Sequence, residues 1–230
     1  MNIIITGASR GIGYDTALQL AKDPKNNILA ISRNEEKLAQ LATSSSSNNI
    51  DYLAYDLSRP NKDALLKKVE AWDSVDILIN NAGLLRNKPF AKLTDKDWWE
   101  IFEVNVFGIS RLIRLLLPKL SSKGGAHIIN MGSMGGVQGS SKFTGLSAYS
   151  ASKAALANLT ECLAEELKED NISVNCLALG AVQTEMLAEA FPGYQAPVES
   201  DQMGEMVAWF AIQGKAFFNG KILPVSISTP

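Results

Sequence analysis

The sequence contains little cysteine and little histidine. Its 230 residues include two cysteines, Cys162 and Cys176, and a single histidine, His127. A structural zinc site takes four Cys or His ligands, which three such residues cannot supply. Two cysteines also make no disulfide scaffold, so a reducing compartment is favoured. We therefore expect no metal site, and we interpret the lone His127 as structural rather than catalytic.

Long hydrophobic runs and a strong charge of one sign are missing as well. Apolar runs such as 115–117 are far shorter than the roughly 18 residues of a membrane span. The start of the chain also lacks the basic and apolar regions of a secretory signal. The sequence has 22 Lys and Arg against 24 Asp and Glu, unlike the basic surface of a nucleic-acid-binding protein. We expect a cytoplasmic protein that binds neither nucleic acid nor membrane.

What is present is an alternation of short apolar strands with helices. The length and the 46% hydrophobic content predict one domain over residues 1–230. Strands are expected at 2–6, 27–32, 52–55, 76–79, 127–131, 172–177 and 221–227. Helices are expected at 11–22, 34–41, 60–71, 95–117 (ending near Pro118), 147–168 and 199–213. This pattern predicts an α/β fold, a doubly wound, seven-stranded, mostly parallel sheet with helices on both faces.

A glycine-rich turn follows the first strand. Residues 6–13 read Thr-Gly-Ala-Ser-Arg-Gly-Ile-Gly. Such glycines let the backbone approach a pyrophosphate, and the helix that follows directs its free N–H groups at it. A tight turn without a ligand is the alternative. The position after the first strand of a doubly wound sheet favours a dinucleotide site.

The end of the second strand indicates which dinucleotide. Ser32 and Arg33 stand where an NAD site needs a carboxylate, and no acid occurs before Glu35. Arg10 provides a second cation within the glycine turn. Two guanidinium groups suit the 2′-phosphate of NADP(H) because they bind phosphate in a bidentate way. We predict a preference for NADP(H) over NAD(H), the alternative being two solvated surface charges.

Tyr149 and Lys153 are four residues apart at the start of a predicted helix and share one of its faces. A phenol has a pKa of about 10, and a neighbouring ammonium, a nicotinamide cation and a helix start all favour the phenolate. We expect Lys153 to lower the pKa of Tyr149. Ser133 follows a strand that ends at the same edge, where its hydroxyl would hold a carbonyl oxygen while Tyr149 protonates it.

Together, Thr6–Gly13, Asn80–Gly83, Asn105, Ser133 and Tyr149-x-x-x-Lys153 resemble the short-chain dehydrogenase/reductase family, over about residues 3–185. The resemblance implies a Rossmann-type fold and hydride transfer between NAD(P) and a carbonyl or alcohol. It implies that Tyr149 is the acid/base and that Lys153 binds the nicotinamide ribose. Ser133 would orient the substrate and Asn105 would hold a water in a proton relay. It also implies a homodimer or homotetramer through helices 95–117 and 147–168.

The cofactor would contact residues from several strand ends. By resemblance, Asp56 and Leu57 would contact adenine, Asn81–Gly83 the adenosine ribose, and residues 180–184 the nicotinamide. The complete set of expected cofactor-binding residues is Gly7, Ser9, Arg10, Gly11, Ile12, Gly13, Ser32, Arg33, Asp56, Leu57, Asn81, Ala82, Gly83, Tyr149, Lys153, Gly180, Val182 and Thr184.

The sequence departs from the family pattern near the substrate. The segment from Ser133 to Tyr149 is longer than usual, which predicts an enlarged loop at 138–145. Leu179-Gly180 stands where Pro-Gly is usual, and the substrate lid, at about 185–200, is short. We expect an open active site that accepts varied carbonyls. Apolar lid residues would contact an apolar substrate or pack on the body: Met186, Leu187, Phe191 and Tyr194.

Two functions fit these features. One is an NADP(H)-dependent reductase of ketones or aldehydes, and the other is a non-catalytic, NADP-sensing binding protein on the same fold. The presence of all four family residues, Asn105, Ser133, Tyr149 and Lys153, favours the enzyme.

Overall fold

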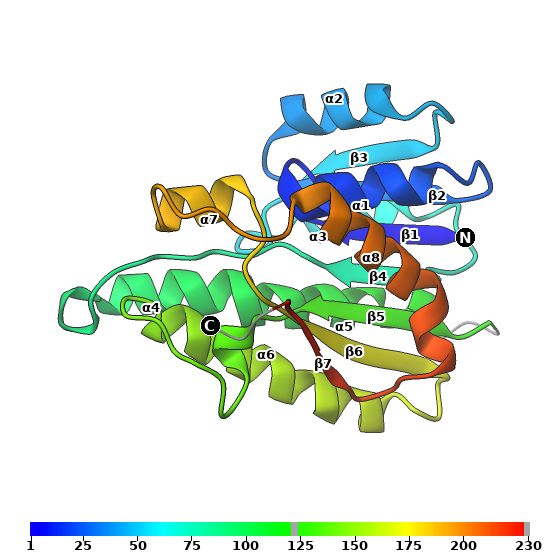
Figure 1. Cartoon of the computed structure of the whole chain (residues 1–230). Coiled ribbons are helices and arrows are strands. Elements are labelled where there is room, and N and C mark those ends of the chain that lie inside the picture. The colour runs from blue at the N-terminus through cyan, green and yellow to red at the C-terminus, as the bar shows by residue number, and fades with distance from the viewer. Residues whose placement is uncertain (121–123, 228–230) are drawn as a thin grey trace.

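The strands form one parallel sheet. The computed structural model describes residues 1–120 and 124–227, and in this part of the chain seven strands lie in the order β3-β2-β1-β4-β5-β6-β7 (Figure 1). All neighbouring strands are parallel. The strands are β1 (Asn2–Thr6), β2 (Asn27–Ser32), β3 (Ile50–Ala54), β4 (Ile77–Asn80), β5 (Ala126–Met131), β6 (Ile172–Leu179) and β7 (Ile222–Val225). The expected doubly wound fold is confirmed.

Helices cover both faces of the sheet. They are α1 (Gly11–Ala21), α2 (Glu35–Ser44), α3 (Lys62–Lys68), α4 (Asp95–Phe102), α5 (Gly108–Leu120), α6 (Ser147–Glu166), α7 (Glu185–Ala190) and α8 (Ser200–Gln213). Three single turns of 3-10 helix occupy Phe90–Lys92, Met134–Gly136 and Gly214–Ala216. Two hydrophobic cores result, one under α1, α2 and α8 and the other under α3, α5 and α6.

The central strands show why the sequence folds this way. Ile3, Ile4 and Ile5 of β1 are completely buried. Successive side chains of a strand point to opposite faces. Ile3 and Ile5 accordingly belong to one core and Ile4 to the other. A continuous apolar run is typical of a strand buried on both faces, as the sequence of β1 predicts.

The predicted helix 95–117 is wrong in two respects. It is interrupted by one turn of π-helix, Glu103–Phe107, and it continues through Pro118 to Leu120. Pro118 lies in the last turn, where its missing N–H removes only one helical hydrogen bond. Leu116 and Leu120 are fully buried, and their packing holds this turn in place.

The other differences lie at the ends of the elements and in the lid. The helix predicted at 60–71 is shorter, Lys62–Lys68, and β6 extends to Leu179. Helix α7 was not predicted as a helix; Thr184 caps it by accepting a hydrogen bond from Leu187 N at 3.2 Å.

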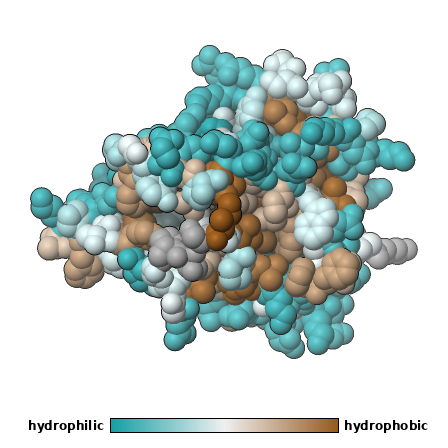
Figure 2. Space-filling view, viewed as in Figure 1, coloured by the Kyte–Doolittle hydropathy of each residue, from teal (hydrophilic) through white to brown (hydrophobic). Residues whose placement is uncertain are grey.

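β7 lies at one edge of the sheet. Its Pro224 is exposed and pairs with Ala178 of β6. Figure 2 shows hydrophobic residues gathered across the middle of the face that carries α8 and β7, with hydrophilic residues over α2. Within the described ranges, no helix combines the length and apolar character needed to cross a bilayer.

Candidate active site

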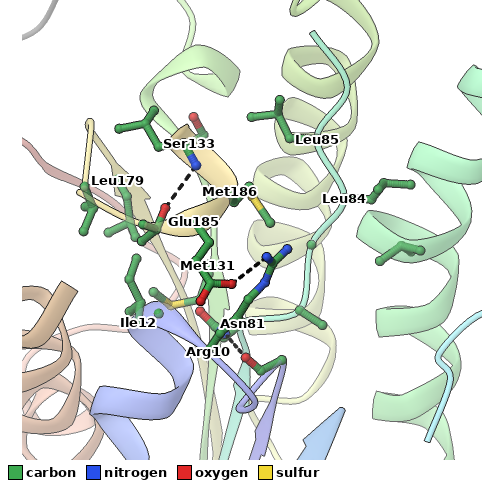
Figure 3. A pocket seen from close by; sticks show the side chains of 18 of the residues that line it. Arg10, Ile12, Asn81, Leu84, Leu85, Met131, Ser133, Leu179, Glu185 and Met186 are labelled. Carbon is green, nitrogen blue, oxygen red and sulfur yellow. Dashed lines mark hydrogen bonds and ion pairs between the residues drawn. The ribbon is translucent and has the colours of Figure 1, made fainter. Parts of the chain in front are cut away.

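A cavity of about 650 Å³ lies beyond the carboxyl ends of the strands (Figure 3). It is lined by the ends of β1, β2, β4, β5 and β6, by the start of α6 and by α7. The structure brings nearly all the predicted site residues to this one cavity. Every residue predicted to act in catalysis or to bind the cofactor lines it, except Gly13 and Asn105.

Gly13 and Asn105 lie behind the cavity wall. A Cβ at Gly13 would lie 2.3 Å from Asn81 Nδ2, so glycine is required there for packing. Asn105 is fully buried. Its Oδ1 accepts from Leu84 N at 2.7 Å, and its Nδ2 donates to Leu84 O at 3.0 Å and to Ser152 Oγ at 2.9 Å. Asn105 therefore fixes the wall at Leu84, and its role in a water relay stays a prediction.

The glycine turn is held against the end of β4. Gly7 and Gly11 have positive φ angles of 68° and 55°, which glycine adopts without strain. Asn81 Nδ2 donates to the carbonyls of Thr6 and Gly7, both at 3.1 Å. The Ala82 N–H donates to Thr6 Oγ1 at 3.0 Å. These bonds fix the shape of the turn.

The first turn of α1 is suited to an anion. It has no side-chain cap and no acidic residue, whereas the side chains of Asn34 and Asn61 cap α2 and α3. The first N–H groups of a helix have no partner within the helix and carry a partial positive charge. The N-terminus of α1 therefore fits the diphosphate of a dinucleotide.

Cations gather at the end of the cavity near β2. Arg33 and Lys37 line it there, and Arg10 lines it from the glycine turn. Lys37 was missed by the sequence analysis, although its place in the first turn of α2, four residues after Arg33, could have indicated it. A cationic pocket of this kind fits a phosphate group on the adenosine ribose.

Arg10 already has partners. Its guanidinium donates to Glu185 at 2.7 Å and to Glu189 at 2.8 Å, both on α7. These hydrogen bonds raise the pKa of Arg10 above its ordinary value. Lys37 Nζ lies 3.6 Å from the other oxygen of Glu185. The acidic side of the lid helix thus covers two of the cations that would bind a 2′-phosphate.

Asp56 follows β3 at the same end of the cavity. Burial raises the pKa of Asp56, but hydrogen bonds from Ser58 and the charges of Arg33 and Arg59 leave it below its ordinary value. Ser58 donates to Asp56 Oδ1 from Oγ at 2.7 Å and from N at 2.8 Å. The carboxylate is therefore ionised and fixed in orientation.

Ser133, Tyr149 and Lys153 meet at the other end of the cavity. Ser133 and Tyr149 are hydrogen-bonded through their side chains. Lys153 Nζ donates to the carbonyl of Met131, the last residue of β5, at 2.7 Å, and lies 5.7 Å from the centre of the Tyr149 ring. Strand β5 and helix α6 thus position the three groups.

The structure does not show the expected lowering of the Tyr149 pKa. Burial raises the pKa of Tyr149 to about 12, against a smaller lowering by the hydrogen bond with Ser133. Burial also lowers the pKa of Lys153 to about 8. Burial disfavours the charged form of each group, and the Lys153 ammonium donates its hydrogen bond to the Met131 carbonyl. A phenolate therefore needs a further positive charge in the cavity.

Three segments form a cap over this end, which we define as residues 84–88, 138–146 and 185–194. Asn87 Nδ2 donates to the Ala190 carbonyl at 2.8 Å, and Lys88 N donates to the Gly145 carbonyl at 2.9 Å. The rings of Phe143 and Phe191 meet edge to face with centres 6.4 Å apart. The lid is short, as expected, but it is joined to both neighbouring segments instead of leaving the site open.

Leu179-Gly180, which departs from the usual Pro-Gly, is held by contacts with the end of β7. Gly180 N donates to the carbonyl of Val225 in β7 at 2.9 Å, and a Cβ at Gly180 would lie 2.3 Å from Ser226 Oγ. Contact with β7 therefore restrains the segment that proline restrains in other family members.

No metal site accompanies this cavity among the described residues. In the ranges 1–120 and 124–227, no three His, Cys, Asp or Glu side chains are grouped to hold an ion.

A doubly wound sheet with a glycine-rich turn and an uncapped first helix defines a dinucleotide-binding protein. The model of the short chain dehydrogenase family matches residues 1–195. The chain belongs to the short-chain dehydrogenase/reductase family of oxidoreductases, which confirms the resemblance seen in its motifs.

Relatives with assigned activities cover most of the chain. The 3-oxoacyl-[acyl-carrier-protein] reductase of Vibrio cholerae is 30% identical over 235 residues, spanning 97% of this chain and 94% of that protein. The corresponding Staphylococcus aureus reductase is 30% identical over 187 residues, spanning 80% and 75%. The L-sorbose reductase from Gluconobacter frateurii, solved with NADPH and L-sorbose, has a TM-score of 0.87 and 26% identity, with 99% and 95% covered.

Proposed function

We propose that the protein transfers a hydride between NADP(H) and a carbonyl or alcohol, acting as a ketone or aldehyde reductase. The observation that carries this proposal is the meeting of Ser133, Tyr149 and Lys153 in one cavity with the glycine turn and the cationic pocket. A protein that only sensed NADP would have no use for a phenol paired with a hydroxyl at the substrate end.

The reaction divides between cofactor and protein. When bound, NADPH supplies a hydride to the carbonyl carbon as the C=O π electrons move to oxygen. The Ser133 hydroxyl donates a hydrogen bond to that oxygen, and the Tyr149 hydroxyl gives it a proton, leaving a phenolate. Lys153 would stabilise the phenolate by its charge and would hold the nicotinamide ribose by a hydrogen bond. Solvent then reprotonates Tyr149.

Replacing Tyr149 by Phe tests this role. Turnover of a ketone or aldehyde panel is expected to fall by roughly 10²–10⁴-fold, because general acid catalysis is lost, while NADPH affinity is retained. The matched control is Tyr14→Phe, since Tyr14 bonds to Ser44 outside the cavity. Reduction at the parent rate by the Tyr149→Phe variant would remove Tyr149 from the mechanism.

The preference for NADP(H) is part of the proposal. Support comes from the cationic pocket of Arg10, Arg33 and Lys37, from the missing carboxylate at the end of β2 and from the NADPH named with the sorbose reductase. Titration of the free protein is expected to show NADPH binding about tenfold or more tighter than NADH, equivalent to about 1.4 kcal/mol. Arg33→Ala is expected to reduce that ratio. Equal or better NADH affinity would contradict the preference.

We also propose a cytoplasmic homodimer or homotetramer that associates through α4, α5 and α6. Trp99 and Phe107 support this interface, because they remain 64% and 38% exposed on it with ring centres 5.9 Å apart. Exposed aromatic groups of this kind mark protein contact surfaces. Cys162 and Cys176 are both free thiols, which suits a reducing compartment.

A further inference from the structure

The cap defined above is the strongest unassigned feature of the molecule. We infer that the substrate is a neutral carbonyl compound carrying a bulky apolar group, aromatic or alicyclic, which binds under this cap. The inference rests on the proposed reductase activity and specifies its substrate class.

The two ends of the cavity differ in charge. Its charged lining residues are Arg10, Arg33, Lys37, Asp56, Glu185 and Lys153. The first four lie on the glycine turn or after β2 and β3, and the carboxylate of Glu185 is turned to Arg10. Lys153 alone belongs to the catalytic end, and its ammonium is hydrogen-bonded to Met131. Among the described residues that line the cavity, Lys153 is therefore the one cation near Ser133, and its hydrogen bond to Met131 competes with an anionic substrate group.

The catalytic end is lined by apolar side chains. In Figure 3, Ser133, Leu85 and Met186 lie in the upper part of the view, and Arg10 and Asn81 in the lower part. Six apolar residues from the three segments of the cap and from the turn after β5 line the cavity: Leu84, Leu85, Met134, Phe143, Met186 and Phe191.

Met134 is buried, but the other five of these apolar residues stay at least partly accessible. No residue of α7 is buried, and Phe143 and Tyr194 remain 40% and 48% exposed while lining the cavity. The exposure of Tyr194 favours contact with an apolar substrate over packing on the body, the other role predicted for the lid residues. An apolar substrate group would remove this surface from water, which is a favourable change.

Hydrogen bonds join the segments of the cap to one another. Asn87 donates to the Ala190 carbonyl, and Lys88 N donates to the Gly145 carbonyl. Its edge-to-face pair, Phe143 and Phe191, bridges two of its segments. A polyhydroxylated substrate would lose hydrogen bonds to water here without replacement, which is costly. The cap thus selects against sugars as well as against anions.

The test compares methyl ketones that differ only in their second group, namely benzylacetone, butanone and levulinate, together with L-sorbose, all with NADPH. The value of kcat/KM for benzylacetone is expected to exceed each of the others by about tenfold or more. A higher value for levulinate or L-sorbose would overturn the inference.

Two variants test the cap itself. Phe143→Ala and Phe191→Ala are each expected to raise KM for benzylacetone several-fold and to leave butanone kinetics nearly unchanged. Phe217→Ala is the control, because Phe217 is 72% exposed and lies outside the cavity. Unchanged benzylacetone kinetics in both cap variants would overturn the inference.

Calorimetry with the NADP⁺-loaded protein separates this inference from the proposed function. Benzylacetone binding tighter than levulinate, with no reduction of any ketone, would support the apolar site and overturn the reductase activity. Benzylacetone binding no tighter than levulinate would overturn the apolar site, even where reduction is observed.

Discussion

The ammonium of Lys153 lies 5.7 Å from the centre of the Tyr149 ring and donates its hydrogen bond to Met131 at 2.7 Å. In this arrangement burial raises the pKa of Tyr149 to about 12. The phenol is thus neutral near pH 7. A positive charge placed in the cavity would favour its ionisation.

A first prediction is that NADP⁺ lowers the pKa of Tyr149. The positive nicotinamide ring would favour the phenolate and shift the pKa downward by roughly 1–3 pH units. Ultraviolet titration of the wild type minus the Tyr149→Phe variant, with and without NADP⁺, measures the ionisation of this phenol. The same pKa in both conditions would contradict the prediction, and Lys153→Met should keep the pKa higher than in the wild-type complex.

The burial of His127 predicts how the free energy of unfolding depends on pH. It is fully buried, with Nδ1 3.1 Å from the Ala211 carbonyl and Nε2 3.1 Å from Asn175 Nδ2. Nδ1 therefore carries the proton, and Nε2 accepts a hydrogen bond from Asn175. This arrangement leaves no place for a second proton on Nε2. Burial lowers the pKa of His127 to about 4, so the unfolded chain binds this proton more tightly between about pH 6.5 and 4.

The free energy of unfolding should therefore fall as the pH falls through this range. His127 alone contributes on the order of 3 kcal/mol to that loss. Urea unfolding at pH 7 and near pH 4.5 measures it, with His127→Gln as the comparison, whose loss should be smaller by that contribution. Equal losses in the two proteins would show that His127 does not titrate in this way.

The pairing of Arg10 with α7 predicts a competition with NADP(H). Glu185 and Glu189 form ion pairs with the Arg10 guanidinium, which a 2′-phosphate would also bind. A double variant, Glu185→Gln with Glu189→Gln, removes this competition and should tighten NADPH binding. All three side chains are substantially exposed, and each such ion pair contributes up to about 1 kcal/mol, so the gain is at most about fivefold for each pair removed.

Fluorescence titration of the reduced cofactor measures this effect. NADH, which lacks the 2′-phosphate, should bind nearly as to the wild type. Glu205→Gln on the exposed side of α8 is the matched control. Weaker NADPH binding in the double variant would mean that the acidic residues hold the lid in its productive place.

The exposed Trp99 predicts the site of self-association. A glutamate at this position would place a charge in the proposed contact of α4 and α5 and weaken it. Light scattering at micromolar concentration should report two or four chains for the wild type and a smaller assembly for Trp99→Glu. Trp209→Glu, on α8, should leave at least a dimer. A monomeric wild type would refute the association.

The buried strands and the cavity edge were predictable because their determinants are local. Ile3–Ile5 form a continuous apolar run, and the glycine turn follows it directly in the sequence. In a parallel sheet the carboxyl ends of the strands lie at the same edge. The predicted fold therefore places Ser133 and Tyr149 near one another at that edge.

What sequence could not predict depends on contacts between distant residues. Arg10 and Glu185 are 175 positions apart, so nothing near Arg10 indicates that its charge is already paired. Helix α7 has only six residues, too few for a recognisable period. The spacing of the glycines does not distinguish one that leaves room for a ligand from one that leaves room for a neighbouring side chain. Gly13 is of the second kind.

Pro224 has a consequence for how copies of the chain meet. The carbonyls of Lys221 and Val225 accept from β6, so the odd-numbered residues of β7 face the sheet and Pro224 directs its backbone outward. Proline has no N–H to offer there. A strand that approached the outer edge of β7 would lack a hydrogen-bond donor at Pro224. This missing donor protects the edge of the sheet against edge-to-edge aggregation.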